Sequence, residues 1–228
     1  ARNRIAKILN CKPREIIFTS GGTESINLAI KGLFRKSKKN HIIISKAEHH
    51  AVLHTVEYLE KEEGAEVTYL DVDKFGMVNV KDVENSIKEN TCLVSIMYAN
   101  NEIGTINPIK EMIDHAHKKG VPVLVDGAQA TPHIEVNVNE LDADFYTFSA
   151  HKMYGPMGIG VLYGKEELLN SLEPVFFGGG MIKEVTFKDT KYNDLPWKFE
   201  AGTMNIAQAI GLAAAIDYLN NIGMKNIE

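Results

Sequence analysis

Cysteine is scarce in this sequence of 228 residues, which contains only Cys11 and Cys92. Two cysteines outside any spaced motif do not make a disulfide framework or a cysteine-rich metal site, and they are typical of a reducing compartment such as the cytoplasm. Cys11 lies just before one predicted strand and Cys92 begins another. We therefore expect both to be buried structural residues.

Long apolar runs and an excess of basic residues are also missing. No stretch approaches the ~20 apolar residues of a membrane span, and the chain does not open on the charged and then apolar pattern of a signal peptide. The formal net charge is −5, and the basic residues between 31 and 39 are interrupted, as in a solvated helix end and loop. These absences argue against membrane and nucleic-acid partners.

Short apolar runs alternate with amphipathic stretches through most of the chain. Runs rich in Val and Ile predict seven strands, at 16–19, 42–45, 67–70, 92–98, 121–125, 145–148 and 159–163. Amphipathic stretches predict helices at 24–33, 51–63, 83–88, 109–119 and 207–219. Continuous apolar strands suit burial on both faces, so we predict an α/β fold with a mostly parallel, or mixed, seven-stranded sheet flanked by helices.

The remaining segments indicate less regular structure and an incomplete chain. The polar segment 189–197 contains Pro196 and is expected to be a loop. The chain opens inside a helical pattern that has no N-cap, and it closes shortly after another helical stretch. We expect residues 1–228 to be one domain of a longer protein.

Several polar motifs follow predicted strands, where ligands bind in parallel sheets. The segment 19–24 joins a strand to a helix. Its Gly21 and Gly22 let backbone N–H groups approach an anion, and Thr23 adds a hydroxyl. The segment lacks the lysine of a P-loop and the spacing of a dinucleotide fingerprint. A phosphate site and a simple strand–helix turn are both compatible with it.

Asp126 and Lys152 each come close behind a predicted strand. Asp126, with Gln129 three residues later, predicts either a helix N-cap with its capping-box partner or a carboxylate that keeps a pyridine nitrogen protonated. A desolvated amine at Lys152 is well placed to form a Schiff base with an aldehyde cofactor. Ser149 and His151 beside it are candidates for binding a phosphate.

Histidine and asparagine side chains complete these motifs. His49 closes a loop after a predicted strand, and an imidazole there can stack on an aromatic cofactor and move protons. His50 and His54 have the i, i+4 spacing of a metal pair, but no third ligand is obvious nearby, so we expect no metal site. Asn101 predicts either a turn or an amide that hydrogen-bonds a ligand. His117 is expected at the surface of a helix.

Together these motifs resemble the cysteine desulfurases and selenocysteine lyases, within the class V aminotransferase group of fold type I enzymes that use pyridoxal 5′-phosphate (PLP). Segment 100–104 is similar to the branch that serves housekeeping iron–sulfur assembly, whereas 126–129 and 199–203 are similar to the branch with selenocysteine lyases. The matching segments span nearly the whole chain in the family's order, and they are Phe18-Thr19-Ser20-Gly21-Gly22-Thr23-Glu24, Glu48-His49-His50, Asn100-Asn101-Glu102-Ile103-Gly104, Val125-Asp126-Gly127-Ala128-Gln129, Ser149-Ala150-His151-Lys152-Met153-Tyr154-Gly155-Pro156 and Phe199-Glu200-Ala201-Gly202-Thr203.

The resemblance implies a role for each matching residue. Lys152 would hold PLP covalently and move a proton, Asp126 would pair with the pyridine nitrogen, and His49 would stack on the ring and act as an acid or base. Gln129 and Asn101 would contact the phenolic oxygen of the ring and nearby groups. The phosphate would be held by Gly22, Thr23, Ser149 and His151, and by Thr203, which in the family reaches the phosphate of the neighbouring subunit.

The resemblance also implies a function. A family member removes sulfur from L-cysteine, giving L-alanine and an enzyme persulfide for iron–sulfur cluster or other sulfur assembly. The expected form is a cytoplasmic homodimer that meets a sulfur acceptor or an iron–sulfur scaffold protein.

One part of the family pattern is missing. The nucleophilic cysteine and the arginine for the substrate carboxylate lie in a C-terminal small domain that has no counterpart here. We expect residues 1–228, as the PLP-binding large domain, to bind PLP but to turn over L-cysteine poorly or not at all. Selenocysteine lyase activity, another class V reaction such as transamination or β-elimination, and a non-catalytic PLP-binding scaffold remain alternatives.

Overall fold

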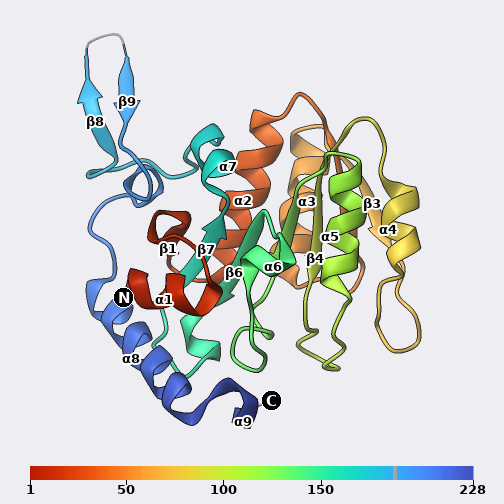
Figure 1. The fold of residues 1–228 in the computed structure, drawn as a ribbon. Coiled ribbons are helices and arrows are strands. Elements are labelled where there is room, and N and C mark those ends of the chain that lie inside the picture. The colour runs from red at the N-terminus through yellow and green to blue at the C-terminus, as the bar shows by residue number, and fades with distance from the viewer. Residues whose placement is uncertain (187–188, 228) are drawn as a thin grey trace.

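The computed structural model describes residues 1–186 and 189–227, and its centre is one twisted sheet (Figure 1). Within these residues the sheet has seven strands, β1-β7-β6-β5-β4-β2-β3 from edge to edge. Strand β7 is antiparallel to both of its neighbours, and every other pairing is parallel. The strand bounds are β1 (Ile16–Thr19), β2 (His41–Ser45), β3 (Glu66–Leu70), β4 (Thr91–Met97), β5 (Val123–Asp126), β6 (Phe145–Ser149) and β7 (Gly160–Gly164). The predicted mixed, mostly parallel sheet is confirmed.

Helices cover both faces of this sheet, as predicted (Figure 1). One face packs on α2 (Gly22–Lys36), α3 (His50–Glu62) and α7 (Glu166–Ser171). The other face packs on α1 (Arg2–Leu9), α4 (Val80–Ser86), α5 (Ile109–Lys118), α6 (Val138–Leu141) and α8 (Ile206–Ile222), which is followed by the short α9 (Met224–Ile227). None of the helices in the described ranges is both long enough and apolar enough to cross a membrane.

The apolar strands are buried on both sides because successive side chains point to opposite faces. In β2, Ile42 and Ile44 enter the core under α2 and α3, whereas Ile43 enters the core under α5. This arrangement explains why the sequence shows continuous apolar runs and no strict alternation.

The direction of the strands brings their carboxyl ends together. Because β7 is antiparallel to both β1 and β6, β1 runs in the same direction as β6 and the parallel strands beyond it. The loops that follow β1, β2, β4, β5 and β6 therefore leave the same edge of the sheet. This edge carries the glycine turn, the histidine loop and the residues that follow Asp126 and Ser149.

The prediction that segment 189–197 is a loop must be corrected. Strand β9 (Thr190–Tyr192) lies inside it and pairs antiparallel with β8 (Ile182–Val185), and a 3₁₀ turn (Trp197–Phe199) begins at its end. The hairpin projects away from the sheet (Figure 1). All four residues of β8 are exposed, so neither strand has the apolar face that a sequence pattern detects.

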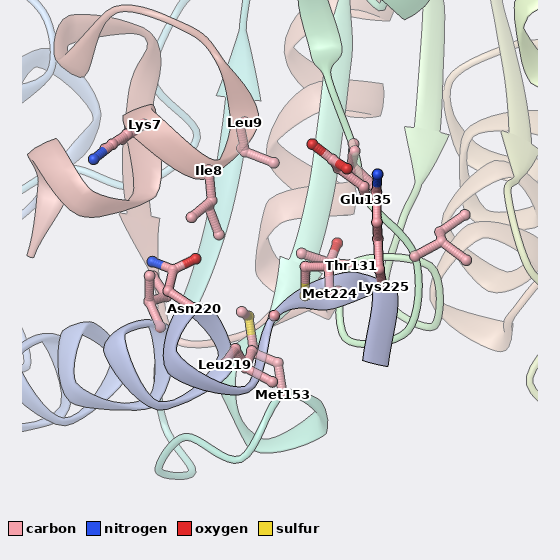
Figure 2. Close-up of a pocket in the computed structure, with 14 residues that line it drawn as sticks. Lys7, Ile8, Leu9, Thr131, Glu135, Met153, Leu219, Asn220, Met224 and Lys225 are labelled. Atoms are coloured by element: carbon pink, nitrogen blue, oxygen red, sulfur yellow. The ribbon is translucent and has the colours of Figure 1, made fainter. Parts of the chain in front are cut away.

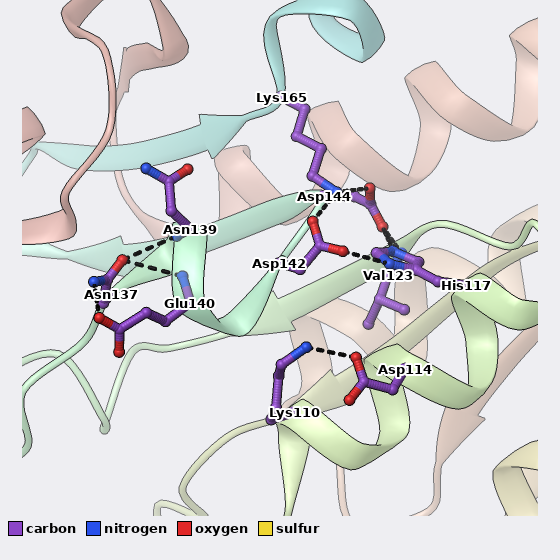
Figure 3. A network of polar contacts seen from close by, with 10 residues as sticks. All are labelled: Lys110, Asp114, His117, Val123, Asn137, Asn139, Glu140, Asp142, Asp144 and Lys165. Atoms are coloured by element: carbon purple, nitrogen blue, oxygen red, sulfur yellow. Dashed lines mark hydrogen bonds and ion pairs between the residues drawn. The ribbon is translucent and has the colours of Figure 1, made fainter.

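A charged cluster lies at the opposite edge of the sheet, where β5 and β6 begin (Figure 3). His117 was expected at the surface, but its ring is half-buried and bridges two carboxylates, Asp142 at 2.9 Å and Asp144 at 2.6 Å. Lys165 reaches the same two carboxylates, at 2.6 and 3.0 Å. Asp144 also accepts a hydrogen bond from the Val123 N–H at 2.8 Å. The cluster therefore ties the end of α5 to β5, β6 and β7.

We predict that Asp144→Ala lowers the free energy of unfolding by about 3 kcal/mol, because it removes the buried carboxylate of the cluster and leaves the Val123 N–H unpaired. The matched control is Asp142→Ala, whose side chain is 48% exposed and whose loss costs less than about 1 kcal/mol. Urea unfolding monitored by circular dichroism measures both. Equal losses in the two variants would contradict the assignment of Asp144 as the centre of the cluster.

Candidate active site

The glycine turn after β1 is shaped by a close contact with β6. The Gly22 N–H donates a hydrogen bond to Ser149 Oγ at 2.8 Å. A Cβ at Gly22 would lie 3.0 Å from that oxygen, and a Cβ at Gly160 would lie 2.5 Å from the Gly21 backbone. The turn thus needs small residues because three segments meet there, and this contact joins two predicted phosphate-binding residues.

The surroundings of the turn suit an anion. Gly22 is the first residue of α2, a helix of 15 residues, and the N–H groups of a first turn have no intrahelical partners. Thr147 Oγ1 is buried about 4.0 Å from a Cβ built at Gly22 and has no hydrogen-bond partner in the described part of the chain. Thr23 is exposed beside this position. Sequence reasoning missed Thr147, because it lies inside an apolar strand.

Asp126 ends β5 and is only 3% exposed. Its carboxylate accepts a hydrogen bond from the Ala128 N–H at 2.9 Å. Burial raises the pKa of Asp126, while that hydrogen bond and the charges of Lys152 and His49 oppose the rise. The segment after Asp126 forms turns and no helix, so the capping-box alternative with Gln129 is wrong.

The turn after Asp126 requires a glycine at position 127, which the sequence analysis did not predict. A Cβ at Gly127 would overlap the ring of Tyr146, whose buried hydroxyl lies 3.0 Å from Thr131 Oγ1. The glycine therefore lets the backbone after Asp126 pass directly over Tyr146. In the sequence, the signal for this close approach was the glycine that directly follows Asp126.

Glu48 is a buried carboxyl group to which the sequence assigned no role. It is 6% exposed, and its Oε1 accepts a hydrogen bond from the Met97 N–H at 2.8 Å. Its Oε2 is buried and lacks a partner among the described residues. Burial raises the pKa of Glu48 well above its usual range, the Met97 hydrogen bond opposes this, and the charge of Asp126 adds to it. Met97 pairs with Asp126 across β4 and β5.

His49 follows Glu48 and caps the next helix. It is the N-cap residue of α3, and its Nδ1 accepts a hydrogen bond from the Ala51 N–H at 3.0 Å. Burial lowers the pKa of His49, Asp126 raises it, and Lys152 and His50 lower it further. The structure therefore brings His49 into the electrostatic reach of both Asp126 and Lys152.

Lys152 lies at the end of a 3₁₀ turn (Ala150–Lys152) that directly follows β6. It is half-buried, and its charge acts on both Asp126 and His49. His151, one residue earlier, is exposed. The chain doubles back at this point, because the N–H groups of Met153 and Gly155 both donate to the Ala150 carbonyl at 2.9 Å. A short, tightly turned segment thus fixes the backbone that carries the amine.

The other predicted residues lie further out. Asn101 is exposed and its amide donates to Glu102 at 3.1 Å, whereas the neighbouring Asn100 donates to the Ala47 carbonyl at 3.2 Å and so ties its loop to the histidine loop. Gln129 is partly exposed in the turn after Asp126. Thr203 is exposed and lines a pocket of about 330 Å³ together with residues of the glycine turn.

A larger cavity, of about 520 Å³, opens between α1, α8 and the loop after Asp126 (Figure 2). Its walls are mainly apolar, with Lys7, Glu135 and Lys225 among the polar groups. It contains none of the predicted site residues, so we do not place the chemistry there. Across the described residues, no three His, Cys, Asp or Glu side chains are grouped as metal ligands.

Comparisons with known proteins agree with this arrangement. The family model described as Aminotransferase class-V matches residues 1–228. A probable cysteine desulfurase of Halalkalibacterium halodurans is 48% identical over all of this chain and 57% of its own length. The crystal structure of a cysteine desulfurase from Escherichia coli matches with a TM-score of 0.94 at 38% identity, covering 99% of this chain and 57% of that one.

A further solved structure, SspA in complex with cysteine, matches with a TM-score of 0.85 at 36% identity, covering 95% of this chain and 59% of that one. The chain spans about half the length of the curated relatives it matches.

We predict that Glu48→Gln makes stability less dependent on pH. The folded pKa of Glu48 is raised, so the wild type loses stability as pH rises from about 4.5 through that raised value, by up to about 1.4 kcal/mol per pH unit relative to the variant. The amide keeps an acceptor for the Met97 N–H and carries no charge. Urea unfolding at a series of pH values measures the difference.

The control for this experiment is Glu62→Gln, which removes an exposed carboxylate of α3. It should follow the wild type at every pH. A Glu48→Gln curve that is parallel to the wild-type curve over the whole range would show that Glu48 is not held protonated.

Proposed function

The chain belongs to the aminotransferase class-V family, and from that premise we propose that it is the PLP-binding part of a cysteine desulfurase-like enzyme. The observation that carries the proposal is a buried carboxylate, Asp126, within electrostatic reach of Lys152 and His49 at the edge where the glycine turn meets Ser149. PLP is the cofactor of this family.

The residues present fit that cofactor in three respects. The first turn of α2, the contact between Gly22 and Ser149, and the buried Thr147 hydroxyl would surround a phosphate. The buried carboxylate of Asp126 would pair with a pyridine nitrogen, and the amine of Lys152 would bond to an aldehyde. When bound, PLP withdraws electrons from the α-carbon of the amino acid attached to it.

The chain's own residues would then divide the work. Asp126 would hold a proton on the ring nitrogen, and Lys152 would hold the cofactor and move a proton to or from the substrate α-carbon. His49 would lie against the ring, while Thr23, Ser149 and His151 would surround the phosphate. Asn101, Gln129 and Thr203 are proposed at the periphery, because each is at least partly exposed near this edge.

We propose L-cysteine as the substrate, with support from a related protein solved in complex with cysteine. In the proposed reaction the carbon–sulfur bond of L-cysteine breaks, a sulfur–sulfur bond forms on an acceptor thiol, and L-alanine leaves. The acceptor is not a thiol of residues 1–228. Burial raises the pKa of Cys11 to about 12 and that of Cys92 to about 11, so neither forms a thiolate readily.

The remaining parts of the proposal concern the setting of the enzyme. Two unpaired thiols support a reducing, cytoplasmic location. A homodimer is supported by α8, which buries Leu212 and Ile216 on one side and leaves Ile206 and Ile210 more than 60% exposed. Transfer of the sulfur to an acceptor or iron–sulfur scaffold protein follows from the proposed persulfide. A PLP-binding protein without turnover is the second candidate, favoured by the two inert thiols.

We predict that the chain develops a visible absorption band on incubation with PLP and that borohydride fixes the cofactor on Lys152. Lys152→Ala should lose the band and the adduct. The matched control is Lys81→Ala, which removes an exposed lysine of α4 and should behave as the wild type. Spectra before and after reduction, followed by peptide mapping, give the readout. An adduct scattered equally over surface lysines would refute the assignment.

We predict that Cys11→Ala and Cys92→Ala, alone or combined, leave any sulfide release from L-cysteine unchanged. Cys92 is buried as expected, whereas Cys11 is only half-buried, and the pKa of each thiol is raised. Sulfide and alanine are measured with a reductant present. Loss of sulfide release in either variant would identify an acceptor thiol within the chain and overturn the view that the acceptor lies elsewhere.

A further inference from the structure

His49 performs a structural task with the same ring that the proposed function places beside the cofactor. N-cap positions usually hold Ser, Thr, Asp or Asn, whose side-chain oxygen accepts a hydrogen bond from the first turn. At the start of α3 the acceptor is the ring nitrogen Nδ1 of His49, which lies 3.0 Å from the Ala51 N–H. The helix therefore uses one of the two ring nitrogens.

This contact decides which nitrogen carries the proton. A neutral imidazole has one N–H donor and one acceptor nitrogen, and the hydrogen bond made by one nitrogen sets the state of the other. Because a backbone N–H can only donate, Nδ1 must be the acceptor, and the proton must lie on Nε2. Protonation of Nδ1 would break the cap.

Burial and the surrounding charges favour the neutral form of the ring. Burial is the largest influence on His49 and lowers its pKa, and the positive charges of Lys152 and His50 act in the same direction. Asp126, at the end of β5 and two strands away from β2, opposes them but does not reverse the shift. The charged groups that face the ring thus come from β5, α3 and the turn after β6.

We propose that His49 presents a fixed Nε2–H to a ligand at this edge of the sheet and acts there as a hydrogen-bond donor, not as a general base. The inference deepens the proposed function, on which its reference to a ligand rests. The lone pair that a base needs is on Nδ1 and is committed to α3. The ligand atom facing Nε2 is therefore an acceptor, such as a carboxylate oxygen, a phenolic oxygen or a thiolate.

The first experiment is a ¹⁵N NMR measurement of the histidine ring nitrogens in the chain without PLP. His49→Asn identifies the signals of His49, because they disappear in that variant. We expect Nδ1 in the unprotonated range and Nε2 in the protonated range at neutral pH, with no averaging between them. A protonated Nδ1, or an exchange-averaged pair, overturns the proposal.

The second experiment tests the cap through melting temperatures. Asn is a good N-cap and Ala is a poor one, so His49→Asn should melt near the wild type and His49→Ala clearly below it. The same pair of substitutions at the adjacent exposed His50, which begins α3 and does not cap it, is the control and should not show this order. Equal melting temperatures for the two His49 variants count against the proposal.

The direction in which stability changes with pH is a third test. The folded pKa of His49 is lowered, so its contribution to stability is complete above about pH 6.5 and is lost as pH falls through the lowered value. The wild type should therefore lose melting temperature relative to His49→Asn on acidification, and a constant difference overturns the proposal. All three readouts use the chain without PLP, so they can succeed when PLP fails to bind, and the proposed function can stand when they fail.

Discussion

A carboxylate that is almost fully removed from water, Asp126, is the constraint on which the candidate site depends. An ion in that position is costly unless its surroundings compensate it. Compensation comes from the Ala128 N–H and from the charge of Lys152. Burial raises the pKa of the nearby carboxyl, Glu48, and the charge of Asp126 adds to that rise. Burial thus dominates the pKa shifts of Glu48 and His49, and the charge of Asp126 modifies both.

Charged side chains have different surroundings at the two edges of the sheet. At the edge where β5 and β6 begin, carboxylates are in direct contact with basic side chains, as in the contacts of Asp144 with His117 and Lys165 (Figure 3). At the carboxyl edge, Glu48 keeps a buried oxygen without a partner in the described ranges, and Lys152 reaches Asp126 only through its field. Saturated pairs favour stability, whereas unsaturated groups leave hydrogen-bonding capacity for a ligand.

The sequence predicted the sheet, its flanking helices and the edge that carries the polar motifs, because continuous Val and Ile runs and strand-end motifs are local signals. It did not predict the contacts between distant segments. Thr147 lies in an apolar strand and Glu48 lies beside a histidine motif. Only the fold shows that each is buried with an oxygen that has no partner among the residues the structure describes. The hairpin of β8 and β9 was missed because it buries no apolar face. The cap made by His49 was also hidden, because histidine is not a usual N-cap residue.

The position of β1 has a consequence for the order in which the site is assembled. In the described part of the chain, β1 lies at the edge of the sheet and has β7 as its one strand partner. Thr19 therefore cannot pair until Gly160 is present. During synthesis from the N-terminus, β2 to β6 can already pair while β1 and the glycine turn remain outside the sheet. Such long-range closure is slow compared with local contacts. The contact between the glycine turn and Ser149 is therefore expected to form last, after the neighbouring strands have placed Asp126.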